Sequence, residues 1–336
     1  MNSVIFISSG LGNALLLTPL VHALKASGQK VTAIFNSPFG CESLYSNSNL
    51  FDEKVILKSK KDHILFMFRN KNKFDVAYLD YFACTKKNFK VSNRIANKII
   101  AHGIPDSINK NKLKHITIIR PDSSYSNAEI NYMLFSDEIK YINFNLDLKF
   151  NNISKFNLPD NYIVIQPSAG NSLTPYKIWN LNNWISFIKQ NPKEHFVILG
   201  DKNELQLSNK FNDEKLNNVT NLIGETSLSE VFDILHFSQL YLGHDSGIMH
   251  MAAAIDKPTL TIWGGSNYNL FGYQNVTSKK HKIITKSPSC WPCNSWLNQN
   301  KNRVENPENC PDFKCLKDIS VDEFNLMFKD FKTKVC

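Results

Sequence analysis

The feature that most constrains the fold is a regular alternation of short apolar runs with longer amphipathic segments. In the first half we expect strands and helices at these positions: Val4–Ile7, Lys30–Phe35, Val55–Leu57 and Asp75–Leu79 as strands, Ala14–Ala26 and His63–Asn70 as helices. Apolar strands separated by amphipathic helices are typical of a parallel sheet covered by helices on both faces. The first half therefore predicts a doubly wound α/β domain.

The second half repeats this alternation more clearly. Its expected elements are strands at Tyr162–Gln166, His195–Leu199, Thr220–Ile223, Leu240–Leu242 and Thr259–Trp263, and helices at Leu181–Lys189, Glu204–Leu216 and Leu228–Phe237. A chain of 336 residues is also long for one core. We therefore predict two Rossmann-like domains, residues 1–150 and 151–336, joined within Asn143–Asp160. The second would carry a cysteine-rich insert, 290–315, and a terminal helix, 320–331, that begins at the capping box Ser320–Glu323.

One segment of the second half suggests a binding site. Asp245-Ser246-Gly247 follows an apolar strand and leads into a small-residue helix, which predicts a sharp strand-to-helix turn. Such a turn exposes unpaired N–H groups and partial positive charge at the carboxyl end of a strand, where a phosphate can bind. His250, four residues after Ser246, can face the same cleft. The alternative is an ordinary helix start with Asp245 or Ser246 as N-cap.

The glycine-rich turn after the first strand does not favour a dehydrogenase. Gly10 and Gly12 begin a G-x-G pattern, but Leu15 stands where a dinucleotide fingerprint needs its third glycine. Asn36 stands at the end of the second strand, where that fingerprint has an acidic residue. The glycines either let a ligand approach the backbone closely or simply form a tight βα turn.

The composition limits the classes of binding partner that we expect. The net charge of +9 comes almost entirely from lysine, and no zinc-finger, RNP or compact basic-helix pattern indicates a nucleic-acid partner. The lysine and asparagine richness either reflects the nucleotide composition of the genome or holds the protein near an anionic membrane or acidic glycolipid. The N-terminal residues resemble a first strand and no apolar run could cross a bilayer, so we expect a cytoplasmic protein, at the inner face of the cytoplasmic membrane.

Four stretches in order along nearly the whole chain carry a family resemblance: Gly12–Pro19, Gln166–Trp179, Gly200–Glu204 and Asp245–His250. Together they resemble glycosyltransferase family 9, the lipopolysaccharide heptosyltransferases. The resemblance implies a GT-B fold, with two Rossmann-like domains facing across a cleft. It also implies inverting transfer of a sugar, heptose as the first candidate, from a donor such as ADP-heptose to a lipopolysaccharide or other cell-surface glycan. The resemblance also implies that this transfer needs no cofactor.

The resemblance also implies roles for individual residues. Lys177 would meet the donor diphosphate, where a cation offsets charge on the leaving group, although a merely solvated lysine is the alternative. Glu204 would accept from the nucleotide ribose, or would serve only as a helix-start glutamate. The other donor residues are hydroxyls and backbone groups for the phosphates (Ser168, Ser172, Thr174, Ser246, Gly247), Asp245 for sugar hydroxyls, and His250 supporting the turn or the phosphate. The acceptor would meet Gly10, Gly12 and Thr18.

One position departs from the family pattern. The family has an aspartate after the glycine as the base that deprotonates the acceptor, whereas this chain has Asn13, whose amide cannot take up a proton at neutral pH. Asp80, at the end of a strand in the first domain, could replace it, or the donor diphosphate could accept the proton while Asn13 orients the hydroxyl. A third reading is a protein that binds its ligands without catalysing transfer, as a partner of another transferase. A nucleotide-sugar epimerase of the GT-B fold is a further alternative.

Four cysteines cluster near the C-terminus. Cys290 and Cys293 form a C-x2-C pair, and Cys310 and Cys315 a C-x4-C pair. Two such pairs could hold structural zinc or iron with no open coordination position. The alternative is reduced thiols that pack a loop.

Overall fold

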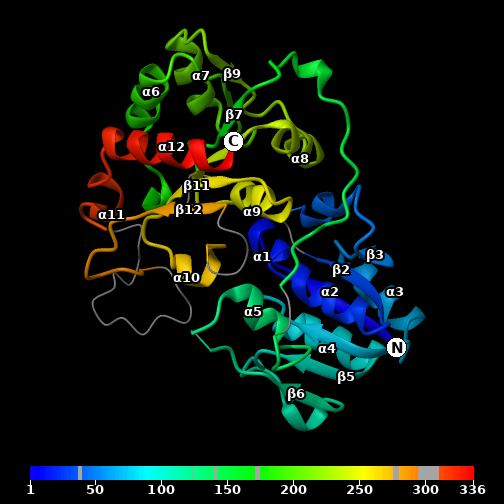
Figure 1. The fold of residues 1–336 in the computed structure, drawn as a ribbon. Coiled ribbons are helices and arrows are strands. Elements are labelled where there is room, and N and C mark those ends of the chain that lie inside the picture. Colours follow the sequence, from blue (N-terminus) through cyan, green and yellow to red (C-terminus); the bar gives the residue numbers. More distant parts are fainter. Residues whose placement is uncertain (37–39, 123, 140–141, 171–174, 275–279, 294–309) are drawn as a thin grey trace. The chain divides into compact units, whose positions relative to one another are not determined.

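The computed structural model describes residues 1–36, 40–122, 124–139, 142–170, 175–274, 280–293 and 310–336 (Figure 1). These residues form two units, Met1–Lys149 and Phe150–Cys336. Each unit contains a six-stranded sheet in which the strands pair in parallel, with helices between them. The predicted α/β class with two doubly wound sheets is confirmed.

The sheet of unit 1 has the strand order β3-β2-β1-β4-β5-β6. Its strands are β1 (Asn2–Ile7), β2 (Lys30–Phe35), β3 (Glu53–Ile56), β4 (Phe74–Leu79), β5 (Ala96–Ala101) and β6 (Ile116–Ile118). Its helices are α1 (Leu11–Leu15), α2 (Thr18–Ala26), η1 (Cys41–Tyr45), α3 (Lys60–Arg69), α4 (Lys86–Ile95), η2 (Lys110–Lys112) and α5 (Asn127–Tyr132). Because β1 pairs with both β2 and β4, the direction of winding reverses between β1 and β4.

The sheet of unit 2 has the equivalent order, β12-β11-β10-β7-β8-β9. Its strands are β7 (Ile163–Ile165), β8 (Phe196–Ile198), β9 (Val219–Asn221), β10 (Tyr241–His244), β11 (Thr259–Ile262) and β12 (His281–Ile284). Its helices are η3 (Ser154–Phe156), η4 (Pro175–Lys177), α6 (Leu181–Gln190), α7 (Leu205–Asp213), α8 (Leu228–Phe237), α9 (Gly247–Ala254), α10 (Tyr268–Phe271), α11 (Lys314–Lys317) and α12 (Val321–Val335). Here winding reverses between β7 and β10, which are paired.

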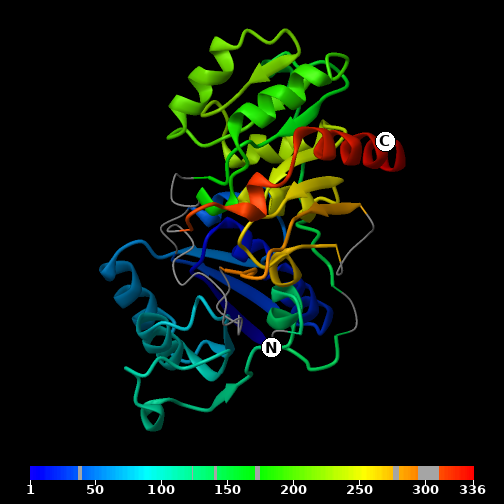
Figure 2. The same ribbon diagram turned by 90° about the vertical axis from the view of Figure 1, so that its left-hand side faces the viewer.

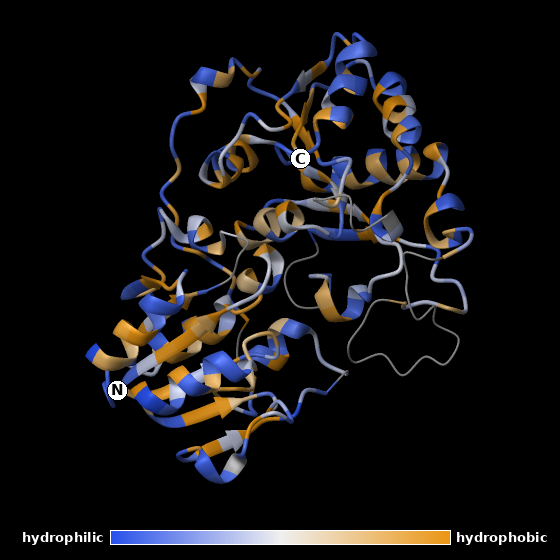
Figure 3. Cartoon of the chain, turned by 180° about the vertical axis from the view of Figure 1, so that it is seen from behind, coloured by the Kyte–Doolittle hydropathy of each residue, from blue (hydrophilic) through white to orange (hydrophobic). Residues whose placement is uncertain are grey.

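Each sheet forms the centre of its own core. Orange follows the strands in Figure 3, and β1, β7, β10 and β11 are buried along nearly all their length. In unit 2 the C-terminal helix α12 lies beside α6 (Figures 1 and 2). Phe324 and Phe328, one turn apart on α12, stack edge-on against Phe187 of α6. The terminal helix is therefore part of the core of unit 2.

The structure corrects several expected elements. The predicted helix Ala14–Ala26 is two helices, because the chain turns at Leu16–Leu17 and Pro19 then lies in the first turn of α2, where proline is tolerated. β5, β6, β12, α4 and α5 were not predicted. α4 passes directly into β5 at Ala96 with no glycine or proline between them, so no breaker signals the change. In the described part of the chain, no helix is long and apolar enough to cross a membrane.

Candidate functional site

The reversal point of the sheet in unit 2 brings together the residues of the strand-to-helix motif. Gln166 directly follows β7, and Asp245 directly follows β10, the neighbouring strand. In open α/β sheets, ligands bind at the carboxyl ends of the strands at such a reversal. The motif found in the sequence therefore lies where the topology favours a binding site.

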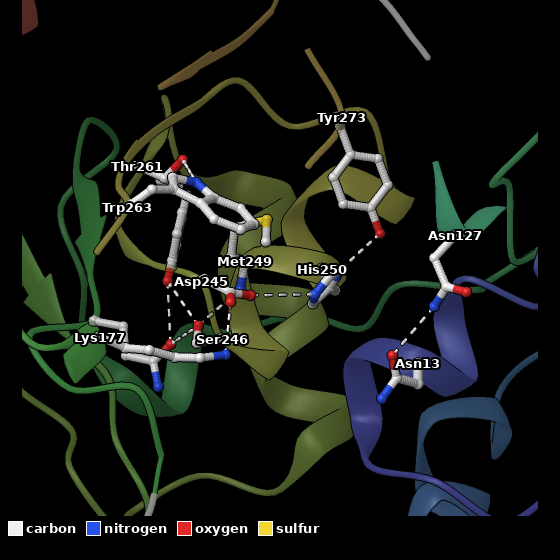
Figure 4. Close-up of polar contacts among 12 residues, drawn as sticks. Asn13, Asn127, Lys177, Asp245, Ser246, Met249, His250, Thr261, Trp263 and Tyr273 are labelled. Atoms are coloured by element: carbon white, nitrogen blue, oxygen red, sulfur yellow. Dashed lines mark hydrogen bonds and ion pairs between the residues drawn. The ribbon is translucent and has the colours of Figure 1, made fainter. Parts of the chain in front are cut away.

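Lys177 and Asp245 form a buried ion pair at this point. The Lys177 Nζ atom, at the end of η4, donates to Asp245 Oδ2 at 2.6 Å (Figure 4). Burial by itself would raise the pKa of Asp245, but the Lys177 ammonium and the imidazole of His250 together hold that pKa well below its usual range. Asp245 is therefore an ionised carboxylate that positions the lysine.

His250 extends the pair into a chain of polar contacts. Its Nε2 lies 3.7 Å from Asp245 Oδ1, and its Nδ1 lies 2.9 Å from the hydroxyl of Tyr273 (Figure 4). Nε2 therefore faces the ionised carboxylate of Asp245, while Nδ1 forms the hydrogen bond with the Tyr273 hydroxyl. His250 thus faces Asp245 from the first turns of α9.

The Ser246 hydroxyl is already committed within the protein. As N-cap of α9 it accepts from the backbone N–H of Met249 at 3.3 Å, and it donates to Gln166 Oε1 at 2.5 Å. Tyr241 also donates to Gln166 Oε1, at 3.1 Å. A Cβ at Gly243 would lie 2.3 Å from the Tyr241 hydroxyl, so that position requires glycine. At this turn, the groups that can donate to an anion are the first backbone N–H groups of α9, beginning at Gly247.

His244 is a residue of this site that the sequence analysis missed. It is fully buried at the end of β10, and its Nε2 accepts from the backbone N–H of Trp179 at 2.9 Å. Its Nδ1 therefore carries the proton and donates to the carbonyl oxygen of Ser168 at 3.3 Å. Burial lowers the pKa of His244 to about 4, so the ring is neutral at pH 7. His244 ties the segment that carries Lys177 to the loop after β7.

The other predicted donor residues are placed differently. Ser168 is buried, and its hydroxyl has no partner among the described residues, which is uncommon for a buried polar group. Glu204 precedes α7 and accepts from the backbone N–H of Asp201 at 2.7 Å, a contact within its own turn. Ser172 and Thr174 lie outside the described residues.

In unit 1 the glycine-rich turn follows β1 at the corresponding reversal point. Gly10 has an extended backbone, and a Cβ built there meets no atom within 4 Å, so packing does not require this glycine and the position is open. Gly12 and Asn13 lie in α1, and Asn13 Oδ1 accepts from Asn127 Nδ2 of α5 at 3.4 Å (Figure 4). This contact leaves the Asn13 NH2 group to donate. Thr18 is fully buried, so it supports the turn from within the core.

Asp80 lies at the end of β4, the strand next to β1. It is buried, and its Oδ1 accepts from the backbone N–H of Ala83 at 2.8 Å. Burial raises the pKa of Asp80 to about 7, against the opposing effect of the Ala83 and Phe82 N–H groups. A carboxyl group with this pKa can exchange a proton near neutral pH.

The four clustered cysteines lie near one another in unit 2. Burial, and to a smaller extent the nearby sulfurs of Cys293, Cys310 and Cys290, raise the pKa of the Cys315 thiol to about 12. Cys293 also donates its backbone N–H to Gly265 at 2.7 Å. No three His, Cys, Asp or Glu side chains within the described ranges are arranged so that they could hold a metal ion. The cysteines therefore lie near one another, and the metal site predicted from their spacing stays a prediction.

The residues missed by the sequence analysis had weak signals. Gln166 stands within a recognised motif, but an amide after a strand has many roles. Tyr273 contacts His250 from 23 residues further along the chain, and no periodicity links the two positions. His244 occupies a strand position that an apolar residue normally fills, and a histidine in a buried strand was the available signal.

Comparisons with known proteins agree with this architecture. The model of glycosyltransferase family 9 (heptosyltransferase) matches residues 129–303, just over half of the chain. Lipopolysaccharide heptosyltransferase 2 of Salmonella typhimurium is 28% identical over 120 residues, 34% of each chain, so the match spans about a third of that relative.

Solved structures match over nearly the whole chain. The structure of the ADP-heptose LPS heptosyltransferase II of E. coli superposes with a TM-score of 0.76 at 17% identity and covers 99% of both chains. The iron-containing dodecameric glycosyltransferase TibC of enterotoxigenic E. coli superposes with a TM-score of 0.58 at 13% identity, covering 100% of this chain and 77% of TibC. At these identities the likeness establishes the fold, which confirms the predicted GT-B class.

Proposed function

Because the chain belongs to glycosyltransferase family 9, we propose that it is an inverting glycosyltransferase using a nucleotide-diphosphate sugar. Heptose is the first candidate sugar, with ADP-heptose as donor and a lipopolysaccharide or other cell-surface glycan as acceptor. It acts in the cytoplasm at the inner face of the membrane, where a lipid-borne acceptor is accessible. The observation that carries this proposal is the cluster of Lys177, Asp245 and His250 at the reversal point of the sheet in unit 2.

The donor diphosphate binds in this proposal at the N-terminus of α9. The backbone N–H groups there carry partial positive charge, and the Lys177 ammonium lies within the same cluster. As the bond to the sugar breaks, these groups offset the charge that builds on the leaving diphosphate. Asp245 accepts from hydroxyls of the donor sugar, and His250, fixed by Tyr273, supports the turn.

The proton of the acceptor hydroxyl is the second requirement. In an inverting transfer, the acceptor oxygen attacks the anomeric carbon, the bond from that carbon to the phosphate oxygen breaks, and the hydroxyl proton passes to a base. Asp80 is our candidate, because its raised pKa of about 7 gives its carboxylate the needed proton affinity. Asn13 orients the acceptor by donating from its NH2 group.

A second candidate function rests on Asn13. If no residue replaces the aspartate of the family, the protein is a non-catalytic binder of a nucleotide sugar that assists another transferase. Donor turnover separates the readings: a transferase releases nucleoside diphosphate when acceptor is added, whereas a binding partner releases none. An epimerase would turn over the donor without any acceptor.

The first test is a calorimetric titration with ADP, UDP, GDP and CDP. We expect selective binding of one nucleotide, ADP first, and loss of that binding in Lys177→Ala. Lys189→Ala is the matched control, because Lys189 also forms an ion pair, with Glu214, but lies on α6 and is exposed. Failure of all four nucleotides to bind, or an equal loss in the two variants, would refute the proposed donor site.

We also propose a structural zinc or iron ion held by Cys290, Cys293, Cys310 and Cys315. The support is the proximity of the other three sulfurs to Cys315, whose thiol pKa is raised first by burial and then by these neighbours, since a cation would offset the repulsion between thiolates. Metal analysis of freshly purified protein should find about one equivalent per chain, as expected of a tetrathiolate site. If the purified protein is folded and binds nucleotide but contains less than about a tenth of an equivalent of metal, the proposed metal site is wrong.

A further inference from the structure

Helix α3 carries two apolar stripes, whereas packing in unit 1 uses one. His63, Phe66 and Met67 form the inward stripe, with Phe66 and Met67 packed against the core of unit 1 and His63 buried. Ile64, Leu65 and Phe68 form the second stripe at the complementary positions of the helix. These three side chains are 55%, 42% and 78% exposed. Packing in the core of unit 1 therefore does not explain why the second stripe is apolar.

The stripe is a cluster and not a set of scattered residues. Positions 64, 65 and 68 are neighbours on a helix surface, since residues three and four apart lie one turn above one another. Single exposed apolar residues are common on soluble proteins, whereas contiguous groups mark interaction sites. Phe68, the most exposed large apolar residue of the described chain, lies within this group. An interacting surface is the direct explanation.

The segment that carries the stripe is rich in basic residues. Residues 58–73 contain six lysines and arginines and one acidic residue, Asp62. Lys58 and Lys73 pair with Glu42 and Glu53 of neighbouring segments, whereas Lys60, Lys61, Arg69 and Lys71 belong to the helix and its C-terminal end. The Asp62 carboxylate accepts from the backbone N–H of Ser59 at 2.7 Å in a capping box, so it is engaged at the helix start. Lys61 shares the outward face with the apolar stripe, at the i, i+3, i+4 and i+7 spacing. The surface thus combines an apolar centre with a cationic margin.

We propose that this face of α3 docks unit 1 on an anionic lipid bilayer. Ile64, Leu65 and Phe68 would enter the boundary between headgroups and acyl chains, and Lys60, Lys61 and Arg69 would contact lipid phosphates. An amphipathic helix with aromatic and aliphatic residues beside lysines and arginines has the composition of an interfacial membrane helix. A second copy of the chain is a poorer occupant, because two such faces would bring like charges together. The proposal thus assigns membrane contact to one helix, α3, and not to the basic surface of the chain in general.

This inference is independent of the proposed transfer reaction. Lipid binding at α3 would persist in a protein that transfers no sugar, and its loss would leave the cluster of Lys177 and Asp245 intact. The nucleotide titration and the lipid assay can therefore fail separately.

The test is co-sedimentation of the full chain with vesicles, either phosphatidylcholine alone or phosphatidylcholine with phosphatidylglycerol. We expect binding to the vesicles with phosphatidylglycerol and a salt-dependent loss of it. Phe68→Ser should lower the partition coefficient on the order of ten-fold, and Lys61→Gln roughly five-fold on anionic vesicles. Leu326→Ser is the matched control for the apolar change, since Leu326 is 73% exposed on helix α12. Lys329→Gln is the control for the charge.

Each other outcome overturns the proposal. Binding that is equal on the two kinds of vesicle, or equal in Phe68→Ser and Leu326→Ser, would exclude an α3 docking face. So would the absence of any vesicle binding by the unmodified chain. Sedimentation velocity without lipid tests whether a second copy of the chain binds this face. Self-association that Phe68→Ser abolishes would assign the face to that second copy. Because Phe68 lies on the surface, circular dichroism and nucleotide affinity of the variant should match those of the unmodified chain.

Discussion

Replacing Lys177 by methionine tests the central ion pair of the proposed donor site. Methionine keeps most of the length and apolar volume of lysine but removes the ammonium that donates to Asp245 at 2.6 Å. The Asp245 carboxylate is then left buried without its cation. Removing one partner of a buried pair typically costs 3–5 kcal/mol, whereas an exposed pair contributes about 0–1 kcal/mol.

The exposure of the two side chains determines how much stability each substitution costs and makes the two costs unequal. Lys177 is 19% exposed and Asp245 is 6% exposed, so water partly screens the lysine end of the pair. We therefore expect Lys177→Met to destabilise unit 2 by about 3 kcal/mol. Asp245→Asn should cost only about 1 kcal/mol, because the orphaned ammonium can reach water. In the double variant the neutral amide needs no cation, so the coupling between the two changes should exceed about 1 kcal/mol.

The effect should depend on pH in a defined direction. The pKa of Asp245 is lowered in the folded protein, so its contribution to stability is present above the unfolded value of 3.8 and is lost as pH falls below it. Without Lys177, burial raises that pKa, and Asp245 takes up a proton on mild acidification. The destabilisation by Lys177→Met should therefore be full at pH 7 and shrink towards pH 4.

Tryptophan fluorescence during urea unfolding is the suitable assay. All five tryptophans lie in unit 2: Trp179, Trp184, Trp263, Trp291 and Trp296. The signal therefore reports the unit that holds the ion pair, even if the two units unfold separately. Equal costs for Lys177→Met and Asp245→Asn, with additive effects in the double variant, would refute the reasoning.

Three further predictions concern other positions. His244→Leu removes the partners of the Trp179 N–H and the Ser168 carbonyl, so it should cost roughly 1–3 kcal/mol in the fluorescence assay and weaken nucleotide binding; an undiminished affinity would exclude a positioning role for His244. Asp80→Asn should remove the loss of stability that unit 1 undergoes as pH rises from about 4 through about 7, because the raised pKa favours the folded state only while the carboxyl is protonated. Hydrogen exchange of unit 1 amides measures this, and an unchanged pH dependence would contradict the raised pKa. Asn13→Ala should abolish transfer and leave nucleotide affinity unchanged, as a coupled release assay and calorimetry would show, whereas a fully active variant would exclude a catalytic role.

Much of the local structure could be predicted from local signals. Helix α8 spans Leu228–Phe237 as expected, and it starts at a capping box whose partners, Ser227 and Glu230, lie within four residues of each other. The start of α9 at Ser246 followed from the strand, turn and helix pattern of one short segment. The junction of α4 and β5 could not be predicted from local signals. The segment from Lys86 to Ala101 has no breaker, and its change from helix to strand is set by pairing of β5 with β4.

The sequence by itself determined the α/β class, the two repeated windings and the segment that carries Asp245 and His250, because hydrophobic periodicity and turn chemistry act over a few residues. Only the tertiary structure decided which partners those residues have. It paired Lys177 with Asp245 across 68 residues, linked His244 to Trp179 and Ser168, and buried Asp80 so that its pKa rises. These outcomes depend on distances and on exclusion of water. Both arise when strands far apart in the chain become neighbours in a sheet, and no spacing along the sequence encodes them.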